Sequence, residues 1–557
     1  MSPSESIPLR EEAARLEDGT SGSSPLQTQS EAQQSKVTAS EPGAVDSARL
    51  LQVRPSETGG GHGSSREVGG GGGRRRKVMR RALAVSLGLL AVFLGVVLVG
   101  FLHMVGVIDW GHPSQGGVSQ YAGEGGVERV TIASVPRNVR ISGKKFVSAA
   151  TGESIVMEGP NVVVKGPPYL PSVEGETVCE DFVNKKCRKE GTCSSCQTFN
   201  EADIKHMKEE MGWNTIRLGV VWAGAQPRDE DALDSDFLNR LKAILSLTDK
   251  HGIHVILDNH GDMVGSAGCG NGVPMWFQQM AAPDLIGKPL TTSFPFSLVP
   301  SLRVKRLKGY ERCGSDVSRW AEHAGDPDYN LKNQCCQAMN SDNPGALGFS
   351  SLSQKTMDYL VRDGPGRQKF VRFWRLLAEA VRDHPSAFAA ELMNEPMTLK
   401  RRHWYNTARA AAEAVNRVIP DMSVSVCDIG EGVVMPAWVA WLFGPGMFID
   451  RSTVAWMKQR DTLFYAWHWY GMPKKAKNAV KTVKVFSEHW NMPSFATEFG
   501  DCEAWTASKE ENISHTYWHY SAYCNTGPAF GNREAPSDTF GACILGWASG
   551  NASKKCD

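Results

Sequence analysis

LMNEP at residues 392–396, together with TEFG at residues 497–500, decides the fold that this sequence predicts. Each stretch places a glutamate at or just beyond the end of a short apolar run. Short apolar runs between turn residues are typical of buried parallel strands. Parallel strands of an α/β barrel end at one rim, and that rim carries the chemistry. We therefore expect Glu395 and Glu498 to meet at the rim of a barrel.

Outward from these two stretches, short apolar runs alternate with segments of helical apolar spacing, such as residues 236–251, 367–383 and 401–417. This alternation predicts parallel strands joined by outer helices. The expected strands are residues 156–164, 215–221, 254–259, 388–393, 423–427, 462–467, 492–497 and 542–547. About eight strands suffice to close a (β/α)8 TIM barrel, which is the α/β fold we expect over residues 129–557.

Two insertions interrupt the alternation, residues 171–199 and residues 283–354, and both contain cysteines. Each follows an expected strand, so each is expected on the rim that carries the active site. We expect these insertions to shape the substrate cleft. For the first insertion, a loop that is only decoration held by disulfides is an equal alternative.

The N-terminal part of the chain has a different character. Residues 1–73 are rich in Ser, Gly, Glu and Gln, which predicts a disordered cytosolic tail. The basic residues 74–81 directly precede an apolar run, residues 82–108, that is long enough to span a bilayer. The basic side of such a run stays in the cytosol. Residues 109–128, rich in Gly, predict a flexible stalk.

Three interpretations of residues 82–108 compete: a buried core helix, a cleaved signal peptide starting at Met79, and an uncleaved signal anchor. Core helices rarely stay apolar on every face over this length. The run exceeds the usual apolar region of a signal peptide, and no clean cleavage site follows. We therefore expect a single-pass type II membrane protein with its catalytic domain in the lumen or outside the cell.

Cysteine placement agrees with this topology, because all 13 cysteines lie at or beyond residue 179. On the oxidising side of a membrane, cysteines form disulfides, which we prefer over zinc for the four cysteines of residues 179–196. The odd total leaves at least one thiol unpaired or intermolecular. Two sequons, at Asn512 and Asn551, would be glycosylated on the same side.

Charge excludes one class of partner. The net charge of +1 and the pI near 7.6 give no electrostatic reason to expect nucleic acid. Asp258, His260 and Asp262 resemble metal ligands in their spacing, but carboxylates and imidazoles also bind sugar hydroxyls. We expect neither a metal nor another cofactor.

Glu395 and Glu498 suit the breaking of a glycosidic bond. Retaining hydrolysis needs one carboxyl to protonate the leaving oxygen and another to attack the anomeric carbon, about 5 to 5.5 Å apart. Strand ends on opposite barrel walls permit that gap. By itself, Asn-Glu-Pro would more often be a turn at the start of a helix, with Pro396 in the first helical position.

In six ordered blocks, the sequence resembles glycoside hydrolases of family 5, in clan A, and among them the endoglycoceramidases and related glucosylceramide-cleaving enzymes. The resemblance runs from about residue 147 to residue 550. The blocks are NVVVKGPPYLP at 161–171, GWNTIRLGVVWAGAQP at 212–227, HGIHVILDNHGDMVGSAGCGNGVPMW at 251–276, ELMNEP at 391–396, AWHWYG at 466–471 and ATEFGD at 496–501. Gly261 stands where the glycolipid branch usually carries Gln.

The resemblance implies that Glu395 is the acid/base and Glu498 the nucleophile. Arg217 would donate to the nucleophile and keep it ionised. Asn394 would bond the sugar 2-hydroxyl, a contact that strengthens in the transition state. Tyr470 would hydrogen-bond the nucleophile.

The resemblance also implies a wider sugar pocket. His468 would help to position the site, and Asp258 and His260 would bind sugar hydroxyls. Lys165 and Trp547 would complete the pocket, the latter by stacking.

The function implied is that of a retaining β-glycosidase that cleaves the bond between glycan and ceramide. The partners would be a glycolipid and, through one transmembrane helix, a membrane. An endo-β-glucanase acting on wall polysaccharide is the first alternative. An inactive module that binds carbohydrate or lipid is the second.

Overall fold

The computed structural model describes the central part of the chain. The described residues are 134–164, 168–174, 179–181, 186–187, 199–262, 264–286, 288, 290–300, 303–304, 344–398, 400–426, 451–469, 476–499 and 502–518. The predicted tail, basic cluster, membrane span and stalk lie outside these residues. Within them, no helix combines the length and the apolar character that crossing a membrane requires.

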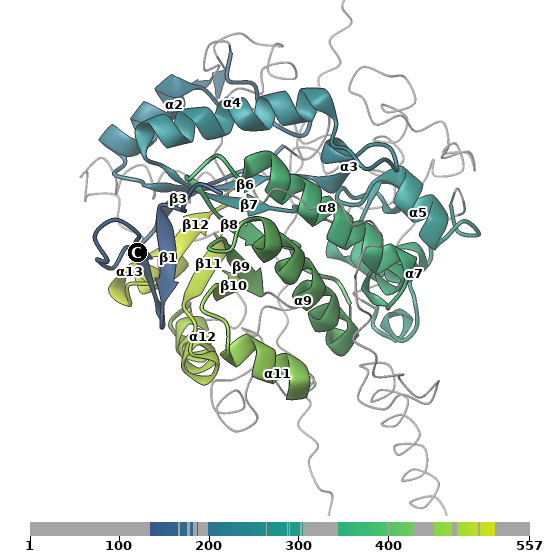
Figure 1. Cartoon of the computed structure of the whole chain (residues 1–557). Coiled ribbons are helices and arrows are strands. Elements are labelled where there is room, and N and C mark those ends of the chain that lie inside the picture. Colours follow the sequence, from purple (N-terminus) through teal and green to yellow (C-terminus); the bar gives the residue numbers. More distant parts are fainter. Residues whose placement is uncertain are drawn as a thin grey trace, which may run out of the picture. The chain divides into compact units, whose positions relative to one another are not determined.

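Eight parallel strands close into a barrel, which confirms the (β/α)8 expectation (Figure 1). In barrel order, β3 pairs with β6, then come β7, β8, β9, β10, β11 and β12, and β12 pairs back with β3. The strands are β3 (Glu158–Val162), β6 (Thr215–Gly219), β7 (His254–Asp258), β8 (Ala387–Glu391), β9 (Ser423–Val426), β10 (Leu463–Trp469), β11 (Ser494–Phe499) and β12 (Ser514–Tyr517).

Helices surround the barrel (Figure 1), and α4 (Ser235–His251), α8 (Pro365–Val381) and α9 (Arg401–Val418) confirm the three helices predicted from apolar spacing. The further helical segments are α2 (Glu201–Lys205), the π-helix η1 (His206–Glu210), α3 (Trp222–Ala225), the 3-10 helix η2 (Ser266–Gly268), α5 (Met275–Ala281), the 3-10 helices η3 (Phe296–Leu298) and η7 (Pro344–Phe349), α7 (Ser351–Val361), α11 (Arg451–Lys458), α12 (Ala476–Trp490) and α13 (Cys502–Glu510).

Helix α4 shows how local sequence sets these boundaries. The Asp234 side chain accepts hydrogen bonds from the backbone N–H groups of Asp236 and Phe237, which are unpaired at a helix start. Gly252 ends the helix in the left-handed conformation, at φ 66°. Between these caps, the residues at helical spacing from Phe237 to Thr248 are buried. The capping residues therefore determine where the helix begins and ends, and the buried apolar residues determine which side of the helix packs against the barrel.

The eighth strand is not the one we predicted. Residues 514–517 close the barrel, whereas the sequence favoured residues 542–547, which lie outside the described residues. The true strand reads Ser-His-Thr-Tyr, so it lacks the apolar run that marks a buried strand. It is buried nonetheless, and the hydroxyl of Thr516 donates to the carbonyl of Thr497 within the barrel at 2.7 Å.

A small hairpin plugs the barrel at the end where the strands begin. Strands β1 (Val139–Ser142) and β2 (Lys145–Ser148) pair antiparallel before the first barrel strand. The ring of Phe146 packs edge-on against the rings of Phe388, Phe464 and Phe495, with centroid distances of 6.1, 5.6 and 5.9 Å. All four rings are buried. The floor of the barrel is therefore apolar and filled.

The two insertions are described in part. From residues 171–199, the structure gives the short antiparallel strands β4 (Cys179–Asp181) and β5 (Lys186–Cys187). From residues 283–354, it gives the segments around η3, η7 and the start of α7. Cys269, in the loop that follows β7, is disulfide-bonded.

Candidate active site

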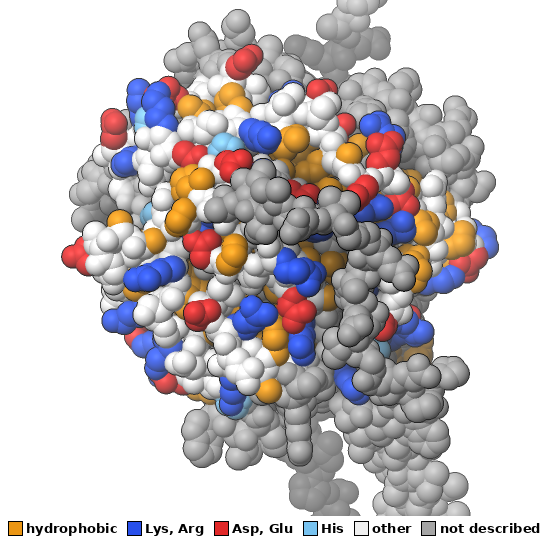
Figure 2. Space-filling view, in the orientation of Figure 1, with side chains coloured by type: hydrophobic (Ala, Val, Ile, Leu, Met, Phe, Trp, Pro, Cys, Tyr) orange, Lys and Arg blue, Asp and Glu red, His pale blue; other side chains and the backbone are white. Residues whose placement is uncertain are grey.

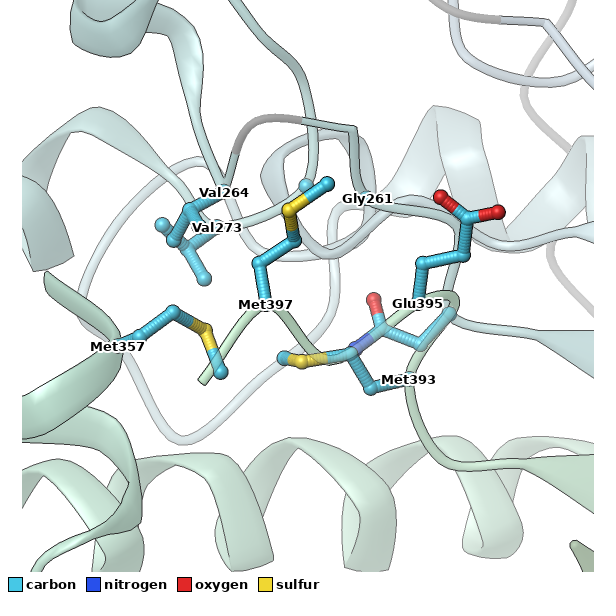
Figure 3. A pocket seen from close by; sticks show the side chains of 9 residues that line it. Gly261, Val264, Val273, Met357, Met393, Glu395 and Met397 are labelled. Carbon is cyan, nitrogen blue, oxygen red and sulfur yellow. The ribbon is translucent and has the colours of Figure 1, made fainter. Parts of the chain in front are cut away.

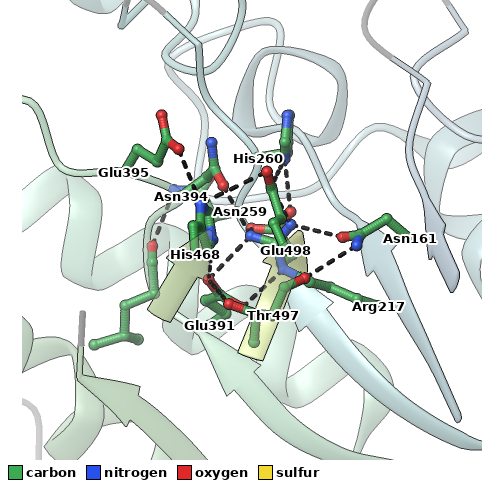
Figure 4. Close-up of polar contacts among 12 residues, drawn as sticks. Asn161, Arg217, Asn259, His260, Glu391, Asn394, Glu395, His468, Thr497 and Glu498 are labelled. Atoms are coloured by element: carbon green, nitrogen blue, oxygen red, sulfur yellow. Dashed lines mark hydrogen bonds and ion pairs between the residues drawn. The ribbon is translucent and has the colours of Figure 1, made fainter. Parts of the chain in front are cut away.

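The predicted residues that the structure describes gather at the carboxyl ends of the barrel strands (Figure 4). Glu498 lies in β11, and His468, in the neighbouring β10, is its partner in the strand register. A register shift between Trp467 and His468 permits this pairing. Glu395 lies four residues beyond the end of β8, at a φ of 40° that non-glycine residues rarely adopt. No helix starts at Pro396; the next helix is α9.

Arg217, fully buried in β6, is the centre of the polar network. Its Nη1 donates to Glu498 Oε1 at 2.6 Å and to Asn161 Oδ1 at 2.8 Å. Its Nη2 donates to Asn394 Oδ1 at 2.8 Å. Burial alone would lower the pKa of Arg217, but the surrounding carboxylates raise it well above its ordinary value. The guanidinium is therefore a permanent cation against the Glu498 carboxylate.

Glu391 is a site residue that sequence reasoning missed. Arg217 donates to both of its oxygens, from Nε at 2.8 Å and from Nη2 at 2.9 Å. Burial opposes the charge of Glu391, yet Arg217 and His468 outweigh that effect and lower its pKa to about 2. The sequence signal was its place as the last residue of an apolar strand, four positions before Glu395. The bidentate pair holds the guanidinium in one orientation.

Asp258, His260 and Asp262 lie together, as their spacing suggested. His260 Nδ1 lies 2.8 Å from Asp258 Oδ2, and His260 Nε2 lies 3.5 Å from Asp262 Oδ2. Burial would lower the pKa of His260, but the two aspartates raise it to about 9. Asp258 also lies 3.1 Å from Arg217 Nη2, although burial raises the pKa of this aspartate. His260 is therefore an imidazolium near neutral pH, 4.0 Å from Glu498 Oε1.

Trp518 is a second residue that sequence reasoning missed. It directly follows β12, and its ring stacks on His260 with a centroid distance of 5.1 Å and an interplanar angle of 15°. The error in the eighth strand explains the omission, because we sought the aromatic platform at Trp547. Trp547, Lys165 and Tyr470 lie outside the described residues.

His468 joins the two predicted catalytic glutamates. Its Nδ1 lies 2.9 Å from Glu395 Oε1 and 3.6 Å from Glu498 Oε2. Burial disfavours a charged imidazole, but the neighbouring glutamates, Glu498 foremost, raise the pKa of His468 well above its ordinary value. The two glutamates differ in exposure, because the side chain of Glu395 is 32% accessible and that of Glu498 only 5%.

One oxygen of Glu395 and one of Glu498 lie within 4.8 Å of each other, and His468 contributes a nitrogen within the same distance. Such a triad can also hold a metal ion. His468 would have to lose its proton to bind one, whereas the carboxylates favour the protonated form. The short gap between the carboxylates fits the two-glutamate arrangement of retaining glycosidases, rather than the wider gap of about 6.5 to 9.5 Å in inverting enzymes.

A pocket opens beside Glu395 (Figure 3). The space between its lining residues, including the part open to solvent, is about 270 Å³, and the lining is mainly apolar. Three methionines and two valines supply its apolar side chains, with Glu395 at one edge (Figure 3). The lining residues are Asn259, Gly261, Val264, Gly272, Val273, Met357, Met393, Glu395 and Met397.

Gly261, the departure noted in the sequence, belongs to the wall of this pocket. A Cβ on Gly261 would lie 3.2 Å from the Cα of Gly272. Gly272 in turn adopts a φ of 123°, which favours glycine. The two glycines therefore allow the backbone at Gly261 and the backbone at Gly272 to approach each other closely.

Comparison with known proteins finds a matching family model and several similar proteins. Residues 181–284 match the family model described as cellulase, glycosyl hydrolase family 5. The endoglycoceramidase of Cyanea nozakii is 27% identical over 245 residues, which are 44% of this chain and 39% of that protein. Endoglycoceramidase I of Rhodococcus hoagii is 22% identical over 395 residues, 68% of this chain and 67% of that protein.

Among solved structures, endo-glycoceramidase II from Rhodococcus sp., as a lactosyl-enzyme intermediate, is 17% identical, with a TM-score of 0.41 over 69% of this chain and 75% of that chain. The chain spans 39% of the length of the Cyanea protein, well under two thirds. The resemblance inferred from the six sequence blocks is confirmed: this chain is similar to glycoside hydrolases of family 5 and to endoglycoceramidases.

Proposed function

We propose that this protein is a retaining β-glycosidase that hydrolyses the bond between the glycan and the ceramide of a glycolipid. The observation that carries the proposal is the close pair of carboxylates, Glu395 and Glu498, with an apolar pocket on the Glu395 side. The pair supports a retaining hydrolysis, and the pocket supports an apolar leaving group.

In the first step, the carboxylate of Glu498 attacks the anomeric carbon, while the carboxylic acid of Glu395 gives its proton to the leaving oxygen. The bond between the sugar and that oxygen breaks, and a bond forms between the sugar and Glu498. The aglycone leaves as an alcohol. These roles are supported by the difference in exposure, because the side chain of Glu498 is buried and that of Glu395 is partly exposed.

In the second step, Glu395, now a carboxylate, takes a proton from water as that water attacks the anomeric carbon. The bond to Glu498 breaks, and the sugar is released with its original configuration. Arg217 and His468 carry positive charge beside Glu498 in both steps, which stabilises the carboxylate as a leaving group.

The pocket supports the lipid character proposed for the aglycone. Because Glu395 protonates the leaving oxygen, the groups beside Glu395 meet the aglycone and not the sugar. These groups include Met357, Met393 and Met397, whose flexible apolar side chains adapt to hydrocarbon. A glucan chain would place hydroxyl groups there, and the methionines could not pair with them.

Membrane attachment through residues 82–108 is part of the proposal. A tethered enzyme meets lipids of its own membrane at high effective concentration. The same attachment would serve a soluble polysaccharide poorly, so the wall-glucanase function is the second candidate. It is kept because the family model that matches is the cellulase model.

The deciding experiment compares the full chain on lactosylceramide, glucosylceramide and β-glucan, with Glu498→Gln as the inactive control. We expect release of intact glycan and ceramide by the wild type only. Turnover of glucan without turnover of either lipid would establish the glucanase. Binding of substrate without turnover of any kind would identify an inactive module.

A pocket variant tests the aglycone assignment separately. Met397→Gln places an amide on the apolar wall, and burying an unpaired amide disfavours hydrocarbon. We expect kcat/KM to fall about tenfold or more for lactosylceramide, and to change less than about twofold for an aryl β-lactoside whose small leaving group does not fill the pocket. An equal fall in kcat/KM for both substrates would contradict the proposal that the pocket binds the lipid aglycone.

A further inference from the structure

Large apolar side chains are exposed on one short segment near the catalytic rim. Phe294 is 78% exposed, Leu298 66% and Val299 42%, and we call these three residues the rim patch. Among the described residues, only Met280 and Val135 are further exposed large apolar side chains. Apolar groups concentrated in this way mark an interaction surface more often than scattered ones do.

The rim patch is connected to the apolar pocket through residues 348–354. The rings of Phe296 and Phe349 lie 4.3 Å apart, and the backbone N–H of Ser293 donates to the carbonyl of Phe349 at 2.9 Å. The amide of Gln354 then donates to the carbonyls of Gly348 and Met397, each at 2.9 Å. Met397 lines the pocket. The exposed segment is therefore fastened to the wall against which the aglycone would lie.

The charged side chains that the structure describes within the segment of the rim patch are basic. Lys288 and Arg303 are exposed, and residues 285–304 contain no Asp or Glu. Asp284, just before this stretch, is paired with Lys355. Figure 2 shows hydrophobic side chains at the edge of the molecule over the α5 region, with charged side chains beside them. Apolar groups flanked by Lys and Arg are suited to the interface of a membrane that contains anionic lipids.

We propose that the rim patch is a membrane-docking surface, whose Phe294, Leu298 and Val299 enter the bilayer interface while Lys288 and Arg303 contact lipid headgroups. This inference rests on the proposed function, because docking there would bring the pocket beside Glu395 to the lipid that it cleaves. A glycolipid could then pass from the bilayer to the cleft without exposing its hydrocarbon to water. A flexible tether could not supply this orientation alone.

The first test measures docking without using activity. The full chain is reconstituted in vesicles of phosphatidylcholine with phosphatidylserine, and deuterium uptake is followed in residues 290–300. We expect uptake there to be lower than in detergent, and to rise again in the double variant Leu298→Asp/Val299→Asp. Equal uptake of the wild type in vesicles and detergent would overturn the proposal.

The second test uses a matched pair of single variants. Val299→Asp lies in the rim patch, whereas Val135→Asp changes a valine of similar exposure, 40%, at the opposite end of the barrel. We expect Val299→Asp to lower turnover of lactosylceramide in vesicles about tenfold and to leave an aryl β-lactoside in solution within about twofold. Val135→Asp should leave both rates within about twofold.

The two hypotheses fail in different ways. If the wild type hydrolyses the aryl lactoside but no ceramide substrate in vesicles or in detergent, the proposed substrate is wrong, and deuterium uptake still decides docking. If the wild type cleaves lactosylceramide and both valine variants behave alike, docking is wrong and the substrate stands. If Val299→Asp lowers both rates and the melting temperature together, another part of the chain covers the patch, which also overturns docking.

Discussion

At the scale of single residues, one cation organises the site. Arg217 contacts three carboxylates, those of Asp258, Glu391 and Glu498, and all three are almost fully buried. Removing one partner from a buried ion pair is costly, because the other charge stays desolvated. The bidentate bond to Glu391 leaves Nη1 of Arg217 directed at Glu498. Glu391 is therefore a positioning residue rather than a reacting one.

Glu391→Gln tests this role. Gln keeps the size of the side chain and removes its charge, so we expect the free energy of unfolding to fall by about 3–5 kcal/mol. We also expect kcat to fall, because Arg217 loses its bidentate partner and binds the Glu498 carboxylate more strongly. Denaturant unfolding and turnover of an aryl β-lactoside measure both effects.

The control for this variant is Glu413→Gln. Glu413 pairs with Arg409 at 3.0 Å on the surface of α9, and exposed pairs of this kind contribute about 1 kcal/mol or less. In acid, the wild type should lose the contribution of Glu391 as the pH falls from 4.5 toward about 2, because its folded pKa lies below the ordinary value. If Glu391→Gln and Glu413→Gln lowered the free energy of unfolding by similar amounts at neutral pH, the structural role assigned to the buried Glu391 would be refuted.

His260 predicts a pH dependence of the opposite sign. Its pKa is raised from 6.5 to about 9 in the folded protein. The contribution of the His260 proton to the free energy of unfolding is therefore complete below pH 6.5 and is lost as the pH rises through about 9. Because the folded state binds one more proton than the unfolded state there, the free energy of unfolding falls by about 1.4 kcal/mol per pH unit within that window. We expect His260→Gln to flatten the alkaline decline of the unfolding free energy.

His254→Gln is the matched control. Burial lowers the pKa of His254 to about 4, so this residue is neutral in both states above pH 6.5 and contributes no slope there. The His254 variant should therefore keep the alkaline decline of the wild type. An unchanged decline in His260→Gln as well would show that the imidazolium beside Asp258 and Asp262 does not form.

Sequence reasoning placed Glu395 and Glu498 together at the rim, because each lies in a recognisable motif, while their catalytic roles stay predictions. It failed for Glu391, whose place before the motif carries no sign of its partner. That partner, Arg217, lies 174 positions away in the sequence, and only barrel closure brings the two together. The roles given to Lys165, Tyr470 and Trp547 stay predictions.

At the scale of elements, seven of the eight barrel strands were predictable from the alternation of short strand-like stretches with segments of helical spacing. Strand β12 was not, because its sequence, Ser-His-Thr-Tyr, is stabilised by hydrogen bonds to neighbouring strands. The hairpin of β1 and β2 precedes the first barrel strand. Its function as a plug became visible only with the barrel closed around Phe146.

Phe146→Ala tests the plug. Removing a buried ring leaves a cavity among Phe388, Phe464 and Phe495, and such changes cost about 3–5 kcal/mol. We expect the melting temperature to fall while kcat at low temperature stays near that of the wild type, because the catalytic rim is at the other end. Calorimetry and an aryl lactoside assay provide the two readouts.

Phe294→Ala is the matched control, because the same change at a 78% exposed ring should alter the unfolding free energy by less than about 0.5 kcal/mol. Comparable losses from the two alanine variants would mean that the hairpin adds nothing to the barrel floor. A fall in kcat of Phe146→Ala at a temperature where the variant is fully folded would also contradict the claim that the apolar floor does not affect the catalytic rim.

At the scale of the whole molecule, the barrel has two different ends. One is closed by an apolar plug, and the other gathers buried charges around Arg217 with an apolar pocket beside them. This division separates the part that stabilises the fold from the part that performs chemistry, as α/β barrels generally do. The predicted anchor and stalk, outside the described residues, would add a tether to a membrane.

The central claim is that Glu498 forms a covalent bond with the sugar. The most direct measurement is mass spectrometry of the full chain after incubation with a 2-deoxy-2-fluoro-β-lactosyl fluoride, whose fluorine slows the release of a glycosyl-enzyme. We predict one added deoxyfluorolactosyl group, on the peptide containing Glu498, and none in Glu498→Gln. Labelling of Glu395 or Glu391, or turnover with inverted configuration and no adduct, would contradict the two-glutamate mechanism proposed for this site.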